Sequence, residues 1–159
     1  MLNLTLITVG TLKEGYLRDA MAEYEKRLQA YCRLQTVSLR ETRLSESPSA
    51  GEIAAALTNE GKQILVAMPP RAYRIALCVE GQQLSSEELA EKLERIGQTH
   101  GAVCLVIGSS YGLAPEVKAA CDWRMSVSRL TFPHQLMRVM LLETLYRSLG
   151  IPAGSKYHK

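Results

Sequence analysis

The chain is organised around one stretch near its C-terminus, Ser126-Val-Ser-Arg-Leu-Thr-Phe-Pro-His-Gln-Leu-Met-Arg-Val-Met-Leu-Leu-Glu-Thr-Leu-Tyr146. A short β-type run ends at Thr131-Phe132. Pro133 then suits the first position of a helix, because its φ is fixed near the helical value and its missing N–H is not needed there. The pattern therefore predicts a helix from Pro133 to about Leu149.

The predicted helix is apolar around most of its circumference, at Leu136, Met137, Val139, Met140, Leu141, Leu142 and Leu145. Such a helix must be covered on more than one side, which favours a sheet on one flank and a second copy of the chain on the other. We therefore expect a homodimer. His134 and Arg138 share one face at the N-terminal end, where the helix dipole and free N–H groups favour anionic or electron-rich ligands.

The composition is typical of one ordinary globular domain spanning residues 1–159. The 159 residues are 47% hydrophobic, and the formal net charge of +3 is compatible with a nucleic-acid partner without requiring one. The N-terminus lacks the pattern of a signal peptide, and no apolar run approaches the roughly 20 residues of a membrane span. We therefore expect a cytoplasmic protein with no membrane contact.

The cysteines and histidines predict neither a disulfide framework nor a metal site. Four cysteines are scattered without a C-x-x-C spacing, and the three histidines lack paired spacing. We interpret the cysteines as reduced thiols, in agreement with a cytoplasmic location.

Strand-like and helix-like segments alternate along the chain. The predicted strands are Leu2–Val9, Val37–Leu39, Tyr73–Val79, Ala102–Ile107 and Trp123–Val127. Gly81 is expected to turn the chain after the third strand. The alternation predicts an α/β fold with a mostly parallel sheet, in which the nearly continuous apolar run Ala102–Ile107 is a central strand.

Helical stripes occupy the segments between the strands. Two of these helices have capping-box signatures, Ser49 with Glu52 and Ser85 with Glu88. A short helix is expected near Pro115 to Ala120. The segment from Arg40 to Ser49 is expected to be an exposed loop, whose Arg40 and Arg43 either contact phosphate or are simply solvated.

Ligands of parallel α/β sheets bind outside the carboxyl ends of the strands. This rule selects three loops: the one after Leu77-Cys78-Val79, the turn Gly108-Ser-Ser-Tyr-Gly112, and Ser128 to Phe132. The glycine turn matches neither G-x-G-x-x-G nor G-x-x-x-x-G-K-[ST], so the main dinucleotide and P-loop signals are missing.

Two alternative functions follow from the residues. Ser110 lies between two glycines at the spacing of a nucleophile elbow and His134 lies downstream, which makes a serine hydrolase one alternative. Against it, the only acids between them are Glu116 and Asp122, in a segment that must also supply a helix and a strand. The second alternative is a non-catalytic RNA-binding dimer.

Several motifs carry a resemblance to a known family. They are Thr8-Val-Gly-Thr-Leu-Lys13, Glu23-Tyr-Glu-Lys-Arg-Leu28, Ile107-Gly-Ser-Ser-Tyr-Gly-Leu113, Leu130-Thr-Phe-Pro-His-Gln-Leu-Met-Arg-Val139, Glu143-Thr-Leu-Tyr-Arg147 and Tyr157-His-Lys159. On these motifs the whole chain resembles the bacterial large-subunit ribosomal RNA pseudouridine N3-methyltransferases. The resemblance implies a single-domain SPOUT-type α/β fold, with a mostly parallel sheet of five to six strands flanked by helices and a C-terminal trefoil knot.

The resemblance also implies an activity and its partners. Members of the family are homodimers that use S-adenosylmethionine to methylate a pseudouridine in helix 69 of 23S ribosomal RNA. Direct transfer of this kind requires no metal. Because so small a domain carries no added RNA-binding module, we expect the assembled ribosome, not naked RNA, to be the substrate.

Site residues follow from the resemblance position by position. It assigns cofactor binding to Leu77, Gly108, Val127, Ser128, Arg129, Leu130, Thr131 and Phe132, and places near the substrate, as the catalytic set, His134, Arg138, Tyr157 and His158. Two positions depart from the family pattern: Ser109 replaces a second glycine, and Lys156 replaces a proline before the Tyr-His pair. The glycines and the proline of the tail, residues 150–159, make it a poor helix former, so we expect it to be mobile and to order over the cofactor cavity when RNA binds.

Overall fold

The computed structural model describes residues 1–159 as a five-stranded sheet, all parallel, in the order β2-β1-β4-β3-β5. The elements in chain order are β1 (Leu2–Val9), α1 (Gly15–Leu28), β2 (Cys32–Leu39), α2 (Ala50–Ala67), β3 (Tyr73–Gln82), α3 (Ser86–His100), β4 (Ala102–Ile107), α4 (Pro115–Ala119), β5 (Trp123–Met125) and α5 (His134–Gly150). No helix is long and apolar enough to cross a membrane.

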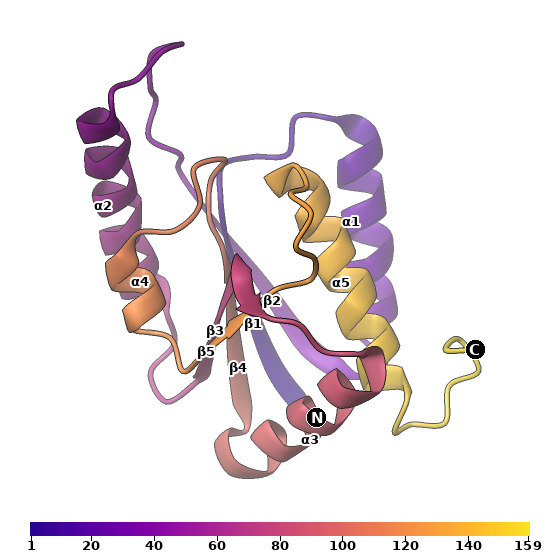
Figure 1. Ribbon diagram of the computed structural model, residues 1–159. Coiled ribbons are helices and arrows are strands. Elements are labelled where there is room, and N and C mark those ends of the chain that lie inside the picture. The colour runs from indigo at the N-terminus through magenta and orange to yellow at the C-terminus, as the bar shows by residue number, and fades with distance from the viewer.

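Helices cover both faces of the sheet (Figure 1). On one face α1, α3 and α5 bury their apolar residues against Leu4, Leu6 and Leu105. On the other face α2 and α4 pack against Ile7 and Val106. Successive residues of one strand thus enter opposite cores, as strand geometry requires. The predicted layered α/β architecture is confirmed.

The strand β4 is central, as predicted. It pairs with β1 on one side and with β3 on the other, and residues 103–107 are each at most 4% exposed. Because β5 lies next to β3, the carboxyl ends of β4, β3 and β5 are neighbours in space. The three loops that the strand-end rule selected therefore meet at one edge of the sheet.

The helix caps agree with the sequence at one site and partly at the other. Before α3, the Ser85 hydroxyl accepts from the Glu88 N–H at 3.1 Å and the Glu88 carboxylate accepts from the Ser85 N–H at 2.7 Å, which completes the predicted box. Before α2, the Ser49 hydroxyl accepts from the Glu52 N–H at 3.1 Å, and the return bond is absent.

Gly81 does not turn the chain, so that prediction is wrong. The strand β3 continues through it to Gln82, with an irregular pairing to β5. A Cβ at Gly81 would lie 2.7 Å from the carbonyl carbon of Met125. The glycine is needed here because two backbones approach closely.

The strand limits also differ from the prediction at two places. The strand β2 begins at Cys32, earlier than expected, and β5 ends at Met125, so Thr131-Phe132 belongs to a loop. In that loop the Ser126 hydroxyl donates to the Ser128 carbonyl, and the Ser128 hydroxyl accepts from the Leu130 N–H, both at 3.0 Å. Such local bonds compete with a β ladder.

The helix α5 begins one residue later than predicted. Pro133 is its N-cap, with an extended ψ of 135°, and the helix continues to Gly150. Leu141, Leu142 and Leu145 are completely buried. Much of the apolar circumference is covered within the chain, because α1 and α3 both pack against α5.

Candidate active site

A cavity of about 740 Å³ opens at the carboxyl edge of the sheet. Its walls come from residues 77–80 of β3, 107–113 after β4, and 125–128 and 131–134 around the β5–α5 loop, together with Lys118 and Met137. Ten of the 21 lining residues are hydrophobic, which is typical of a small-molecule site with a few polar groups to orient the ligand.

The glycine turn after β4 forms one wall. A Cβ at Gly108 would lie 2.1 Å from the carbonyl oxygen of Gly112, so no other residue fits there without a backbone shift. Gly112 has a φ of +87°, and its N–H donates to the Ser109 carbonyl at 2.9 Å. Ser109 has no positive φ, and the departure from the family pattern therefore leaves the turn intact.

The β5–α5 loop forms a second wall. Its two serine bonds curl the chain so that Val127, Ser128, Thr131 and Phe132 line the cavity. Arg129 and Leu130 do not line it, and the Leu130 side chain is 71% exposed. Of the eight residues predicted to bind a cofactor, these two have their side chains outside the cavity.

The third wall, from β3 and α4, contains a salt bridge that the sequence did not indicate. Leu77, as predicted, lines the cavity, and so do Glu80 of β3 and Lys118 of α4. The Lys118 ammonium lies 2.5 Å from the Glu80 carboxylate and is the main cause of a lowered Glu80 pKa. Only the packing of α4 beside β3 brings these distant residues together, so no local signal could have found them.

His134 stands at the start of α5 and lines the cavity. Burial lowers the pKa of its imidazole from the ordinary value of 6.5; Arg138 and Lys13 act in the same direction, and Glu41 opposes them. The ring is therefore neutral at neutral pH and able to accept a proton.

Arg138 lies behind His134 and does not line the cavity. The side chain is 2% exposed, and its guanidinium donates to the carbonyl oxygens of Val9 at 2.7 Å and Gly10 at 3.0 Å. Burial lowers its pKa from 12.5. In a single chain Arg138 ties α5 to the end of β1.

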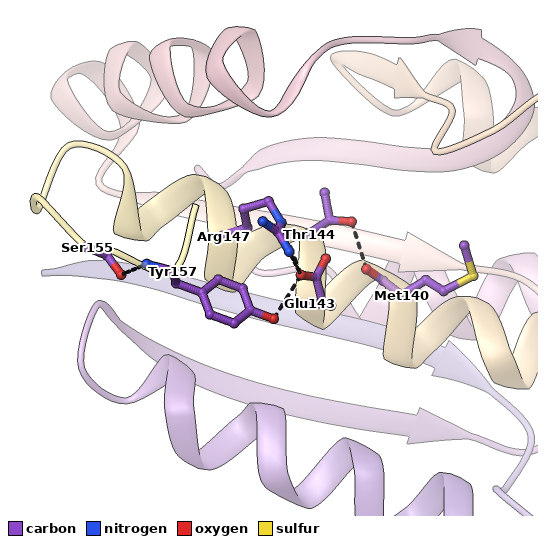
Figure 2. A network of polar contacts seen from close by, with 6 residues as sticks. All are labelled: Met140, Glu143, Thr144, Arg147, Ser155 and Tyr157. Atoms are coloured by element: carbon purple, nitrogen blue, oxygen red, sulfur yellow. Dashed lines mark hydrogen bonds and ion pairs between the residues drawn. The ribbon is translucent and has the colours of Figure 1, made fainter. Parts of the chain in front are cut away.

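The tail residue Tyr157 packs beside Glu143, Tyr146 and Arg147 in the C-terminal half of α5, whereas His134 is the first residue of that helix. Figure 2 shows its ring lying along the helix, with the hydroxyl donating to the Glu143 carboxylate at 3.1 Å. The Arg147 guanidinium lies 4.7 Å from the ring centroid, and the ring of Tyr146 packs edge-on at 4.9 Å. Tyr24, burial and Glu143 raise the pKa of Tyr157 to about 12, so in this position it is a hydrogen-bond donor and not a base.

His158 and the preceding turn are also packed. His158 Nε2 lies 2.8 Å from the Glu87 carboxylate of α3, which has a lowered pKa because of this contact. The Ser155 N–H donates to the Gly150 carbonyl at 3.0 Å, and the Tyr157 N–H donates to the Ser155 hydroxyl at 3.2 Å. The tail was expected to be mobile, but it is packed on α5 and α3. Although Lys156 replaces the proline of the family pattern, the hydrogen bonds of Ser155 hold this turn.

The family model described as "Predicted SPOUT methyltransferase" matches residues 2–158. The chain belongs to this family. SPOUT methyltransferases use a methyl donor, and the sequence-based recognition of the family is confirmed.

Similar proteins of known name cover the whole chain. One from Bifidobacterium adolescentis is 47% identical over 99% of this chain and 100% of its own length, and one from Clostridioides difficile is 41% identical over the same shares. Both are named ribosomal RNA large subunit methyltransferase H. A solved methylase family protein from Neisseria gonorrhoeae has the same fold, with a TM-score of 0.53 at 15% identity over 91% of this chain and 82% of its own.

The serine hydrolase alternative is wrong. Ser110 is exposed in the glycine turn and makes no hydrogen bond to His134, although both line the cavity. Asp122, one of the two candidate acids, accepts from the Arg74 N–H at the amino end of β3. This end of the strand is at the opposite edge of the sheet from the cavity. The other candidate acid, Glu116, is exposed in α4 and makes no hydrogen bond to His134, so the nucleophile, base and acid of a hydrolase are not assembled.

The cysteines are all free, and no group of three or more His, Cys, Asp or Glu side chains is arranged to hold a metal ion. Burial raises the pKa of Cys104 to about 12 and that of Cys32 to about 11. These two thiols pack as small apolar groups in the core.

Proposed function

We propose that the protein transfers a methyl group from S-adenosylmethionine to N3 of a pseudouridine in helix 69 of large-subunit ribosomal RNA. The observation that carries the proposal is the strand-end cavity, in a chain whose full-length relatives are named large-subunit ribosomal RNA methyltransferases. The cytoplasm, where ribosomes are assembled, is the proposed location.

The cavity fits the proposed methyl donor. Its volume of about 740 Å³ is ample for a nucleoside with an amino-acid arm. Leu77, Val127 and Met125 offer apolar walls for a flat base, and the missing side chain of Gly108 lets a ligand approach the backbone. Arg129 and Leu130 would act through main-chain groups, because their side chains lie outside the wall.

The mechanism requires little covalent chemistry from the protein. When bound, S-adenosylmethionine supplies a methyl group on a positively charged sulfur, already activated for attack by a nucleophile. The chain's task is to hold the reacting nitrogen in line and to remove its proton. His134 lines the cavity as a neutral imidazole, so we assign it to accept the N3 proton.

Arg138 acts through His134 in this proposal. It fixes the start of α5 by its bonds to Val9 and Gly10, and its positive charge helps to keep the imidazole neutral. A direct contact of Arg138 with the substrate would require these two backbone bonds to break.

The tail is proposed to act on the other subunit of a homodimer. Tyr157 packs against Glu143, Tyr146 and Arg147, which lie roughly 14–20 Å along α5 from His134, so it does not reach the cavity of its own chain. Leu136, Met140, Glu143 and Arg147 form a line along α5 that is not buried within the chain. If two such lines pack antiparallel, each tail reaches the partner's cavity, where Tyr157 and His158 hold the target base.

A C-terminal trefoil knot is part of the same proposal. The knot would thread the chain through the loops that form the cavity, as the family resemblance implies. Its consequence would be a cavity that cannot open without unfolding.

The deciding experiment is transfer of labelled methyl groups. We expect ribosomes from cells that lack this protein to be labelled far better than naked transcripts, because one small domain needs the assembled RNA surface. Labelling of neither substrate, with tight ribosome binding, would favour the non-catalytic RNA-binding alternative. Equal labelling of both would refute the requirement for an assembled ribosome.

The homodimer is tested separately by sedimentation at micromolar concentration. We expect a species of twice the chain mass. A stable species of 17.6 kDa would contradict the dimer and the assignment of the tail to the partner's cavity.

A further inference from the structure

A second groove adjoins the cavity at the carboxyl edge of the sheet. It has a volume of about 720 Å³, and only three of its 12 lining residues are hydrophobic. The groove runs from residues 10–13 after β1 to residues 38–45 at the end of β2, and Tyr111 lines both the groove and the cavity. The Tyr111 side chain is 46% exposed at this junction.

Three cations line the groove, Lys13, Arg40 and Arg43. All three are exposed, and none makes a salt bridge within the chain. Unpaired cations on an open polar surface can bind the phosphates of a nucleic acid. The neighbouring exposed ring of Tyr111 can stack on a base.

The loop that carries two of these cations is held in place from both sides. The Thr42 N–H donates to the buried carboxylate of Glu60 at 3.0 Å, and Asn59 Nδ2 donates to the Thr42 hydroxyl at 3.0 Å. At the other end the Gly10 N–H donates to the Leu39 carbonyl at 2.7 Å. Arg40 and Arg43 therefore project from a fixed segment, so little order has to be gained on binding.

The loop carries two carboxylates: Glu41 lines the groove, and Glu46 is exposed but does not line it. A Glu41 oxygen lies 3.0 Å from the position that a Cβ at Gly10 would take, and a guanidinium nitrogen of Arg138 lies 3.8 Å from the same point. The buried charge of Arg138 thus offsets Glu41. The lining of the groove therefore stays cationic, with three cations against the single carboxylate of Glu41.

We propose that this groove is the subsite for the RNA backbone flanking the target nucleotide. Lys13, Arg40 and Arg43 contact its phosphates, and Tyr111 stacks on the base next to the one that enters the cavity. The inference rests on the proposed function, since it identifies the RNA-binding surface of that same site.

The test compares two double variants that remove equal charge. Arg40→Ala/Arg43→Ala removes both loop cations; Arg33→Ala/Arg95→Ala removes two exposed arginines, one at the start of β2 and one in the C-terminal part of α3, away from the groove. For each, methyl transfer to ribosomes is measured over a range of salt, and S-adenosylmethionine binding is measured by calorimetry.

We expect the loop variant to raise KM for ribosomes about 10-fold with kcat unchanged, and to reduce the slope of log KM against log salt by about 1.5. The binding constant for S-adenosylmethionine should be unchanged in both variants. The control variant should match the wild type in KM and slope. An unchanged KM and slope in the loop variant, or an equal effect in the control, would overturn the subsite.

A binding assay separates this inference from the proposed activity. Retention of ribosomes by the protein is measured without any methyl donor. Weaker retention by the loop variant alone would support the subsite even if no methyl transfer were seen. A wild-type protein that does not retain ribosomes would overturn the subsite directly.

Discussion

The two ends of α5 are built differently. At the N-terminal end the cavity wall consists of backbone turns and apolar side chains, with Gly108 packed against the Gly112 carbonyl and His134 held beside the buried Arg138. At the C-terminal end the tail is held by charged and aromatic contacts at the surface, centred on Glu143 (Figure 2).

This difference separates a preformed site from a detachable element. Backbone packed against backbone cannot adjust, so the cavity keeps its shape with or without a ligand. Exposed polar contacts such as that of His158 with Glu87 are weak because water competes for both groups. We therefore expect the tail to leave its position on α5 more easily than the glycine turn can change its shape.

Gly108→Ala tests the preformed cavity and should have the largest effect. We expect no detectable binding of S-adenosylmethionine in calorimetry and no methyl transfer, because the new Cβ would lie 2.1 Å from the Gly112 oxygen. Gly97→Ala in α3 is the matched control, since its Cβ would meet only a Leu2 methyl group at 3.5 Å. Binding by Gly108→Ala at the wild-type affinity would show that the turn is adaptable.

Deleting Tyr157 to Lys159 should affect only the detachable end. Methyl transfer to ribosomes should fall by about 100-fold or more, because the target base loses the residues that hold it in line for attack. Cofactor affinity and the sedimentation of the dimer should remain nearly unchanged. Full activity of the truncated protein would leave these residues with a purely structural role.

The pH dependence of kcat tests whether His134, at the cavity end of α5, accepts the proton. A lowered pKa means that the imidazole is neutral above that pKa, so activity should be lost as pH falls through a midpoint below 6.5. His134→Gln should lower kcat by about 100-fold and abolish this acid limb. His100→Gln, at the end of α3, is the control and should keep the limb. A midpoint above 6.5 would contradict the assignment.

Tyr157→Phe tests whether the tyrosine hydroxyl takes part in proton transfer. On α5 the pKa of this phenol is raised to about 12, and the proton is assigned to His134, so phenylalanine keeps the ring that holds the target base and removes no assigned base. We expect kcat within about threefold of the wild type, since one surface hydrogen bond is lost. A loss comparable to that of the full deletion would assign the proton transfer to the tyrosine hydroxyl.

Ser109→Gly should have the smallest effect. The backbone at this position needs no positive φ, so glycine gives no steric relief and adds freedom to the unfolded chain. We expect the free energy of unfolding in urea to decrease by about 0.5–1 kcal/mol, with cofactor affinity unchanged. Tighter cofactor binding in this variant would show that the serine constrains the turn.

Much of the fold could be predicted because its signals are local. The apolar run of β4, the box at Ser85 and the proline before α5 each depend on neighbouring residues. Gly81 was misinterpreted because a glycine in a turn and a glycine at a close approach of two strands look the same in sequence. The three loops could be selected because parallel strands end at a common edge.

By itself the sequence determined the order of strands and helices and the family. Of the eight residues it predicted to bind a cofactor, six line the cavity. Only the tertiary structure decided that Arg138 lies behind the cavity, that Lys118 meets Glu80, and that the tail packs on Glu143 and Glu87. The reason is distance along the chain. Periodicity and caps act within a few residues, whereas these contacts depend on how α1, α4 and α5 pack on the sheet.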